Sequence, residues 1–264
     1  MTPLFILPDS LEAPFAAKWS PAFAAQFEAL HDSPLSVETF SFYASVLAVF
    51  SSKIEGEAIE LDSYVKHKRF GAHFLPDYTR KTDDLYDAYR LAQTQPLTPD
   101  NLRAAHQLLT RSLLAPSARG HHRQGLMYVT TADGRIEYVA TAPQLVPTEM
   151  ARLWQDTAQL LREPLGIAQS FYYAALLHLV LVKIHSYEDG NGRTARLLEK
   201  WFLAEKLGAK AWYLESEKYY YQHHAVYYNN LRRMGLEYER LDYQRALPFL
   251  QILLQSLRPP QPGG

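Results

Sequence analysis

The 264-residue chain contains no cysteine. This absence excludes disulfide bonds, thiol catalysis and cysteine-ligated metal sites. The chain also lacks an excess of either charge, because 27 Lys and Arg residues are balanced by 28 Asp and Glu residues. A nucleic-acid binder normally presents a strongly basic surface. With 47% hydrophobic residues and only 12 glycines, the composition favours a globular protein with a sizeable core and no nucleic-acid partner.

Long hydrophobic runs are also missing. The apolar run at residues 4–7 is bounded by prolines and is too short for the core of a signal peptide. The most apolar segment, Leu176–Ile184, is interrupted by His178 and Lys183 and falls well short of the length that spans a membrane. We therefore expect a soluble, cytoplasmic protein with no membrane partner.

Signals for helices dominate the chain. Ser20-Pro21 and Thr98-Pro99 each place a capping residue before a proline at the first helical position. Apolar residues recur at helical spacing after both pairs. Further helices are expected near residues 36–54, 80–93, 146–162, 165–184, 193–207, 216–233 and 242–257. The pattern indicates an all-α fold.

One segment departs from the helical pattern. Residues 126–131 and 135–139 are β-prone and flank Ala132-Asp133-Gly134, and an Asp-Gly pair between such runs predicts a β-hairpin. An open edge of this hairpin could accept an extended peptide from another protein. From the local sequence alone, a surface hairpin without a binding role is the more frequent case.

Residues 185–196, HSYEDGNGRTAR, concentrate the polar chemistry of the chain. His185 follows an apolar helix, and an imidazole there can act as a general base near neutral pH. Asp189 offers the hard oxygen ligand that Mg²⁺ prefers. Glu188 is expected to point away from the site and Tyr187 inward.

The second half of this loop predicts an anion site. Gly190, Asn191 and Gly192 allow backbone conformations that direct amide groups toward a ligand above the N-terminus of the following helix. Arg193 and Arg196 share one face of that helix near its positive end. Two cations are unfavourable there unless an anion lies between them, so the pattern favours a polyphosphate ligand.

These residues match the motif of the Fic family, H-x-F-x-[D/E]-G-N-G-R-x-x-R, at every functional position. Tyr187 replaces the usual Phe and Ser186 replaces a common Pro. Residues 120–123, GHHR, followed by the hairpin, resemble the segment of the family on which protein targets dock. Residues 40–235 in all resemble the Fic core and its flanks. The resemblance implies a Fic-type helical bundle with a small β-hairpin flap, and a protein target that docks on residues 126–139.

The resemblance also implies the chemistry, which is transfer of AMP from ATP to a hydroxyl of a protein. His185 would be the general base and Asp189 would hold Mg²⁺. The turn Gly190–Gly192 would bind the α- and β-phosphates. Arg193 would contact the phosphates, and Arg196 would orient the γ-phosphate.

A second motif is informative beside the first. Residues 51–56, SSKIEG, fit the inhibitory pattern [S/T]-x-x-x-E-[G/N] of Fic proteins that carry their inhibitor before the Fic domain. Ser51 and Glu55 lie one helical turn apart, and Glu55 could pair with Arg196 in place of the γ-phosphate. The resemblance therefore implies an autoinhibited adenylyltransferase, which Glu55→Gly should activate and His185→Ala should inactivate.

The expected organisation follows from these motifs. The segments are an N-terminal helical extension (1–36), an inhibitory-helix region (37–60), the Fic core and its flanks (61–240), a C-terminal helix (241–257) and a disordered tail (258–264).

Other functions stay open at this stage. The chain could remove AMP from a modified target, or transfer UMP, phosphate or phosphocholine, or modify one of its own 18 tyrosines. A nucleotide-sensing module without turnover is a further class, and the intact His185 argues against it. Zinc binding through the pairs 121–122 and 223–224 is disfavoured, because adjacent histidines lack the helical spacing of metal ligands.

Overall fold

The computed structural model describes residues 3–130 and 134–257. The helices are α1 (Glu12–Ala16), α2 (Pro21–Glu28), α3 (Phe42–Ile54), α4 (Leu61–Phe70), α5 (Pro76–Thr94), α6 (Pro99–Leu109), α7 (Val146–Arg162), α8 (Ile167–Ile184), α9 (Asn191–Leu207), α10 (Ser216–Gln222), α11 (His224–Arg232) and α12 (Leu247–Gln255). Strands β1 (Tyr128–Thr130) and β2 (Ile136–Val139) form one small sheet, and three 3₁₀ turns, Ala209–Tyr213, Tyr238–Arg240 and Tyr243–Arg245, join the last helices. The predicted helical fold with a small hairpin is confirmed.

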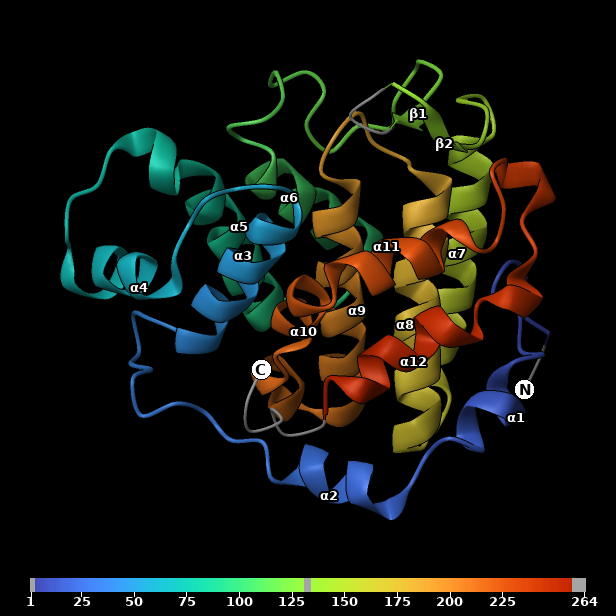
Figure 1. Ribbon diagram of the computed structural model, residues 1–264, viewed down its shortest axis with the longest axis horizontal. Coiled ribbons are helices and arrows are strands. Elements are labelled where there is room, and N and C mark those ends of the chain that lie inside the picture. Colours follow the sequence, from blue (N-terminus) through green and yellow to red (C-terminus); the bar gives the residue numbers. More distant parts are fainter. Residues whose placement is uncertain (1–2, 131–133, 258–264) are drawn as a thin grey trace.

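The core is built around α8, which packs most extensively against α9 and is flanked by α7 and α12 (Figure 1). A helix that is apolar on all sides is stable in water only when it is covered on all sides. By length and composition α8 could cross a membrane, and 78% of it is buried inside the protein, as in the core helix of a soluble fold. It is longer than the apolar segment Leu176–Ile184, because Phe171 to Ala175 continue the buried run.

The N-terminal residues pack onto this core. Phe15 on α1 and Phe27 on α2 are both about 1% exposed, and the ring of Phe27 meets Phe171 of α8 edge-on at 5.7 Å. The carboxylate of Asp156 on α7 accepts hydrogen bonds from the backbone N–H groups of residues 5–7. These contacts join the extension to the helical core.

Helix α3 brings a distant part of the chain to α9. It is capped by Ser41, whose side chain accepts a hydrogen bond from the N–H of Ala44. It packs against α5 and α10 and also contacts α9. Ser51 in its last turn and Glu55, which follows the helix, reach the first turns of α9, as the contacts below show.

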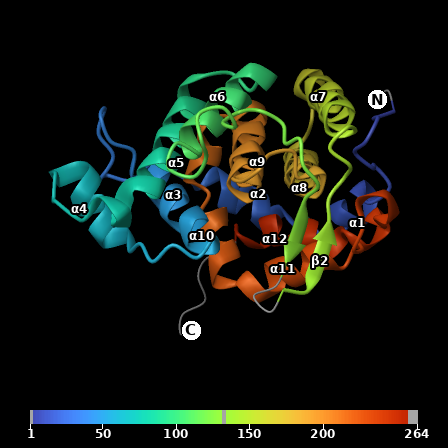
Figure 2. The same cartoon turned by 90° about the horizontal axis from the view of Figure 1, so that it is seen from above.

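The hairpin lies above the C-terminal end of α8 in Figure 1 and beside α11 in Figure 2. Its strands are antiparallel, with an irregularity between Val129 and Thr130. Val139 donates a hydrogen bond to the carbonyl of Leu236, so the outer edge of β2 is partly covered. In residues 3–130 and 134–257 no third strand pairs with the outer edge of β1. The free edge of the hairpin is therefore that of β1.

Several helix boundaries differ from prediction. The helix expected at 216–233 is two helices, α10 and α11, which meet at His223. No glycine or proline marks this break in the sequence. In the structure, the ring of His223 stacks on Tyr219 at 4.0 Å. The helix expected at 242–257 begins at Leu247, because Pro248 starts it and a 3₁₀ turn precedes it.

One predicted cap is also corrected, and one helix was missed. The side chain of Ser20 makes no capping hydrogen bond, whereas Thr98 accepts one from the N–H of Asn101 as expected. Helix α4 was not predicted. The hairpin turn at residues 131–133 and the tail at 258–264 lie outside the described residues.

Candidate active site

His185 closes α8 in a left-handed conformation, with φ 53° and ψ 57°. It is the one non-glycine residue with positive φ in the described part of the chain, and such strain is concentrated at functional sites. Its Nδ1 lies 3.1 Å from the carbonyl of Val182. A carbonyl oxygen only accepts, so Nδ1 carries the proton and Nε2 keeps its lone pair.

The surroundings keep this imidazole neutral. Burial lowers the pKa of His185 below its usual range, and the cation of Arg123 lowers it further. The hydrogen bond to the carbonyl of Val182 and the carboxylates of Glu55 and Asp189 raise this pKa but do not cancel the effect. A neutral Nε2 at physiological pH is the state that a general base requires.

The loop after His185 is held by Asn191. Its side-chain oxygen accepts from the N–H of Tyr187 at 2.9 Å, and its amide donates to the carbonyl of the same residue at 2.9 Å. The side chain of Asn191 therefore shapes the loop, which leaves its backbone for the predicted nucleotide site. Tyr187 is buried and Glu188 exposed, as expected.

Asp189 presents an exposed carboxylate, and its Oδ1 accepts from the N–H of Gly190 at 2.5 Å. The carbonyl of Asp189 lies 3.0 Å from Nε2 of His106 on α6. Nδ1 of His106 accepts from the N–H of Gly120 at 2.9 Å, so Nε2 must be the donor. The ring of His106 also stacks on Tyr187 at 3.7 Å. Burial lowers the pKa of His106 to about 4, which keeps this bridge neutral.

The two arginines of the loop lie on the first turns of α9 and are almost fully buried. Arg196 donates from Nη2 to Oε1 of Glu55 at 2.6 Å and from Nε to Oγ of Ser51 at 2.8 Å. The predicted pairing of Glu55 with Arg196 is therefore confirmed. Arg193 lies 4.0 Å from Oε1 of Glu57, a second carboxylate from the segment after α3.

Gly192 leaves the space that the Glu55 carboxylate occupies. A Cβ atom at Gly192 would lie 2.7 Å from Oε1 of Glu55 and 3.2 Å from Nη1 of Arg196. Burial alone would raise the pKa of Glu55, but the cations of Arg196 and Arg193 outweigh it and hold that pKa below its usual value. An ionised carboxylate thus lies at the N-terminus of α9, where the sequence predicts an anion.

Behind Arg196 lies a buried polar cluster that the sequence did not reveal. Within it, Nδ1 of His178 lies 2.7 Å from Glu199 and its Nε2 lies 2.9 Å from the hydroxyl of Tyr227. That hydroxyl also lies 3.5 Å from Nη1 of Arg196. Tyr220 donates to Glu199 as well. The sequence signal for this cluster was a polar side chain at an apolar helix position. The cluster could not be predicted from it, because the partners lie on different helices.

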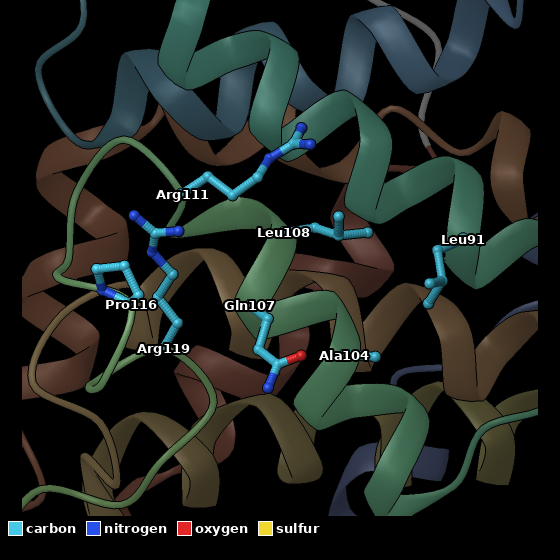
Figure 3. A pocket seen from close by; sticks show the side chains of 7 residues that line it. All are labelled: Leu91, Ala104, Gln107, Leu108, Arg111, Pro116 and Arg119. Atoms are coloured by element: carbon cyan, nitrogen blue, oxygen red, sulfur yellow. The ribbon is translucent and has the colours of Figure 1, made fainter.

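A cavity of about 430 Å³ lies on the far side of α6 from the loop. Figure 3 shows its lining, which comprises Leu91, Ala104, Gln107, Leu108, Arg111, Pro116 and Arg119. Arg111 reaches from this lining toward α5, where it pairs with Asp84 at 3.0 Å. The opposite face of α6 carries Leu109, which closely approaches Gly190.

Residues 96–203 match the Fic/DOC family. This match covers less than half of the chain and identifies a Fic domain within it. The matched residues run from the segment before α6 through the hairpin and the loop 185–196 into α9. Helix α3 lies outside them, so its role depends on its contacts. The domain match supports a Fic-type enzyme that transfers a nucleotide-phosphate group to proteins.

Solved structures of Fic proteins share this fold. A Fic family protein from Desulfovibrio desulfuricans G20 matches with a TM-score of 0.74 and 21% identity, over 97% of this chain and 74% of that one. A Fic domain containing signaling protein from Bacteroides thetaiotaomicron VPI-5482 matches with a TM-score of 0.66 and 21% identity, over 89% and 92%. Fic-1 from C. elegans matches with a TM-score of 0.63 and 16% identity, over 94% and 68%. No curated protein sequence matches significantly.

Proposed function

We propose that this Fic protein transfers AMP from ATP to a hydroxyl side chain of a target protein, and that Glu55 restrains the reaction. One observation carries the proposal. The carboxylate of Glu55 fills the space above Gly192 and pairs with the buried Arg196. A carboxylate in that place is a stand-in for a phosphate group, because both are anions that a helix N-terminus and an arginine stabilise.

The chemistry would begin at His185. Its Nε2 would take the proton of the target hydroxyl. The hydroxyl oxygen would then attack the α-phosphorus of ATP, and the bond from that phosphorus to the β-phosphate oxygen would break. The products are an AMP ester of the target and pyrophosphate. The hydrogen bond from Nδ1 to Val182 holds the ring in the tautomer that this step needs.

The nucleotide would be held by the following turn. The backbone of Gly190–Gly192 and the side chain of Arg193 would bind the phosphates, and Arg196 would orient the γ-phosphate. The exposed carboxylate of Asp189 fits Mg²⁺, which commonly binds one or two carboxylates together with phosphates. The ion would supply charge neutralisation to the phosphates.

Autoinhibition follows from shared space. The carboxylate of Glu55 and a phosphate of ATP cannot both occupy the volume above Gly192, and both require Arg196. While Glu55 is in place, ATP would lack the contact that aligns its α-phosphorus with the incoming hydroxyl. The target would dock along the free edge of β1 by backbone hydrogen bonds and would present its hydroxyl side chain to His185.

Intact-mass spectrometry tests the reaction. Wild-type protein, Glu55→Gly and Glu55→Gly/His185→Asn are incubated with Mg²⁺ and either ATP, α,β-methylene ATP or β,γ-methylene ATP, with and without a cell extract as a source of targets. Asn is the matched replacement because it tolerates the left-handed backbone of His185. We expect a gain of one AMP with ATP and β,γ-methylene ATP, in Glu55→Gly only.

The two methylene analogues of ATP distinguish AMP transfer from the alternative reactions. A gain of one phosphate with α,β-methylene ATP would replace AMP transfer by phosphate transfer. Tight ATP binding by calorimetry without any transfer, even with extract, would favour a nucleotide-sensing module instead. Transfer by wild-type protein at the rate of Glu55→Gly would contradict the restraining role of Glu55.

A further inference from the structure

Arg123 is a buried cation without a carboxylate partner. The residue is 2% exposed, and in the described part of the chain no acidic side chain lies within ion-pair distance of it. Its guanidinium donates instead to backbone carbonyls, to His185 at 2.6 Å, to Gly125 at 2.7 Å and to Thr141 at 2.5 Å. A buried charge is costly unless its surroundings compensate it, so the burial of Arg123 indicates a specific role for its contacts.

These three carbonyls come from three separate places, and a fourth, longer contact reaches the carbonyl of Ile184 at 3.4 Å. His185 is the candidate base. Gly125 lies before β1 and Thr141 lies after β2, so they are the two ends of the hairpin. One planar guanidinium therefore joins both ends of the target-docking hairpin to the turn that carries the base. An ammonium group of lysine lacks the fork geometry for such a three-way contact.

The C-terminus of α8 depends on these contacts. The last carbonyls of a helix have no partner within the helix. At α8, the hydroxyl of Tyr138 on β2 donates to the carbonyl of Lys183 at 2.7 Å. The backbone N–H of Arg123 donates to the carbonyl of Ser186 at 3.0 Å, and its side chain takes the carbonyl of His185. A cation is also electrostatically favoured at this end of a helix.

We propose that Arg123 is a positioning residue, which holds His185 in its left-handed conformation and sets the hairpin at a fixed place relative to Nε2. The inference about His185 geometry stands on the contacts alone. Its effect on catalysis rests on the proposed AMP transfer. Because Arg123 is buried, it would act through His185 and the hairpin.

A spectroscopic test needs no activity. Protein with ¹⁵N-labelled histidine is examined by NMR at a pH where imidazole is neutral, and the signal of His185 is assigned by its absence in His185→Asn. Wild-type protein should show the single Nδ1–H tautomer. Arg123→Met should show a mixture of tautomers, and Arg123→Lys an intermediate state. Tyr138→Phe is the control, because it loosens the hairpin without removing a contact to His185.

Melting curves establish which variants are folded. If Arg123→Met does not fold, Arg123→Lys, which keeps the charge, carries the test alone. A folded Arg123 variant with the wild-type tautomer would overturn the proposal. A tautomer change of equal size in Tyr138→Phe would also overturn it, since the effect would then belong to the hairpin in general.

Kinetics in the Glu55→Gly background give the second readout. Displacement of the base should lower kcat by about 100-fold, as misplacement of a reacting group by roughly 1 Å does, and leave the KM for ATP within about twofold. An equal loss in kcat and in ATP binding would point to general damage and contradict a positioning role. If Glu55→Gly transfers nothing, the proposed function fails, and the tautomer experiment still decides the role of Arg123.

Discussion

Glu55→Gly should have opposite effects on the free protein and on the complex with ATP. The substitution removes a carboxylate 2.6 Å from Arg196, whose side chain is 1% exposed, whereas that of Glu55 is 27% exposed. Breaking a buried pair costs about 3–5 kcal/mol, and an exposed pair contributes about 0–1 kcal/mol. For this partly exposed pair we expect a loss of about 1–3 kcal/mol in the free energy of unfolding. Ser51 remains as a partner of Arg196 and favours the lower end.

The complex of Glu55→Gly with ATP should instead be stabilised relative to that of the wild-type protein. Without Glu55, Arg196 is free for the γ-phosphate, and a hydrogen bond to a charged group contributes about 1.5–3 kcal/mol. At 1.4 kcal/mol for each factor of ten, productive ATP binding should strengthen by roughly 10- to 100-fold. ATP at saturating concentration should therefore raise the melting temperature of Glu55→Gly by more than it raises that of the wild-type protein.

Thermal melting with and without Mg²⁺–ATP, run beside the intact-mass assay, measures both effects. Glu60→Gly is the matched control, because it makes the same substitution at a glutamate that pairs with Lys53 at the surface. It should change neither the ATP-induced shift nor the transfer of AMP. The reasoning is refuted if Glu55→Gly melts like the wild-type protein and responds to ATP by the same amount.

Three further expectations concern the loop and its support. Burial lowers the pKa of His106 to about 4. The contribution of the neutral His106 to the free energy of unfolding is therefore fully present above about pH 6.5 and is lost as the pH falls toward 4. In denaturation at several pH values, the wild-type protein should lose about 3 kcal/mol on the acid side, and His106→Gln should not show this loss. Gly190→Ala should lower the melting temperature more than Gly71→Ala. Both glycines have positive φ, but a Cβ atom at Gly190 would lie 2.8 Å from Thr110, whereas one at Gly71 would meet open space. The two variants should differ by about 1–3 kcal/mol in the free energy of unfolding, and equal losses would refute the clash. His185→Asn should abolish transfer while melting above His185→Ala, because alanine is strained at a φ of 53°, and an inverted order would argue against backbone strain at this position.

Much of the helical fold could be predicted from the sequence because its signals are local. Helix α7 begins and ends where predicted, at Val146 and Arg162, with Pro147 at its start. The break between α10 and α11 could not be predicted in this way. Nothing at His223 forbids a continuous helix, and the chain turns there because its side chains pack against other elements.

The same distinction between local signals and distant contacts applies to the candidate site. The residues from His185 to Arg196 are close in sequence, and their types and spacing indicate a phosphate site before any fold is known. His106 and Arg123 are single polar residues whose partners lie 83 and 62 positions away. Only the packing of α6 and the hairpin against the end of α8 makes them neighbours of the site. Glu55 was an exception, because a short motif marked it.

The contact between Glu55 and Arg196 joins two groups 141 positions apart within one folded chain. Their local concentration is set by the fold and does not change when the protein is diluted. A restraint of this kind would respond to the concentration of ATP and to displacement of α3, but not to the amount of the protein itself. A change in expression level would alter how many copies are present and leave the fraction of restrained copies the same.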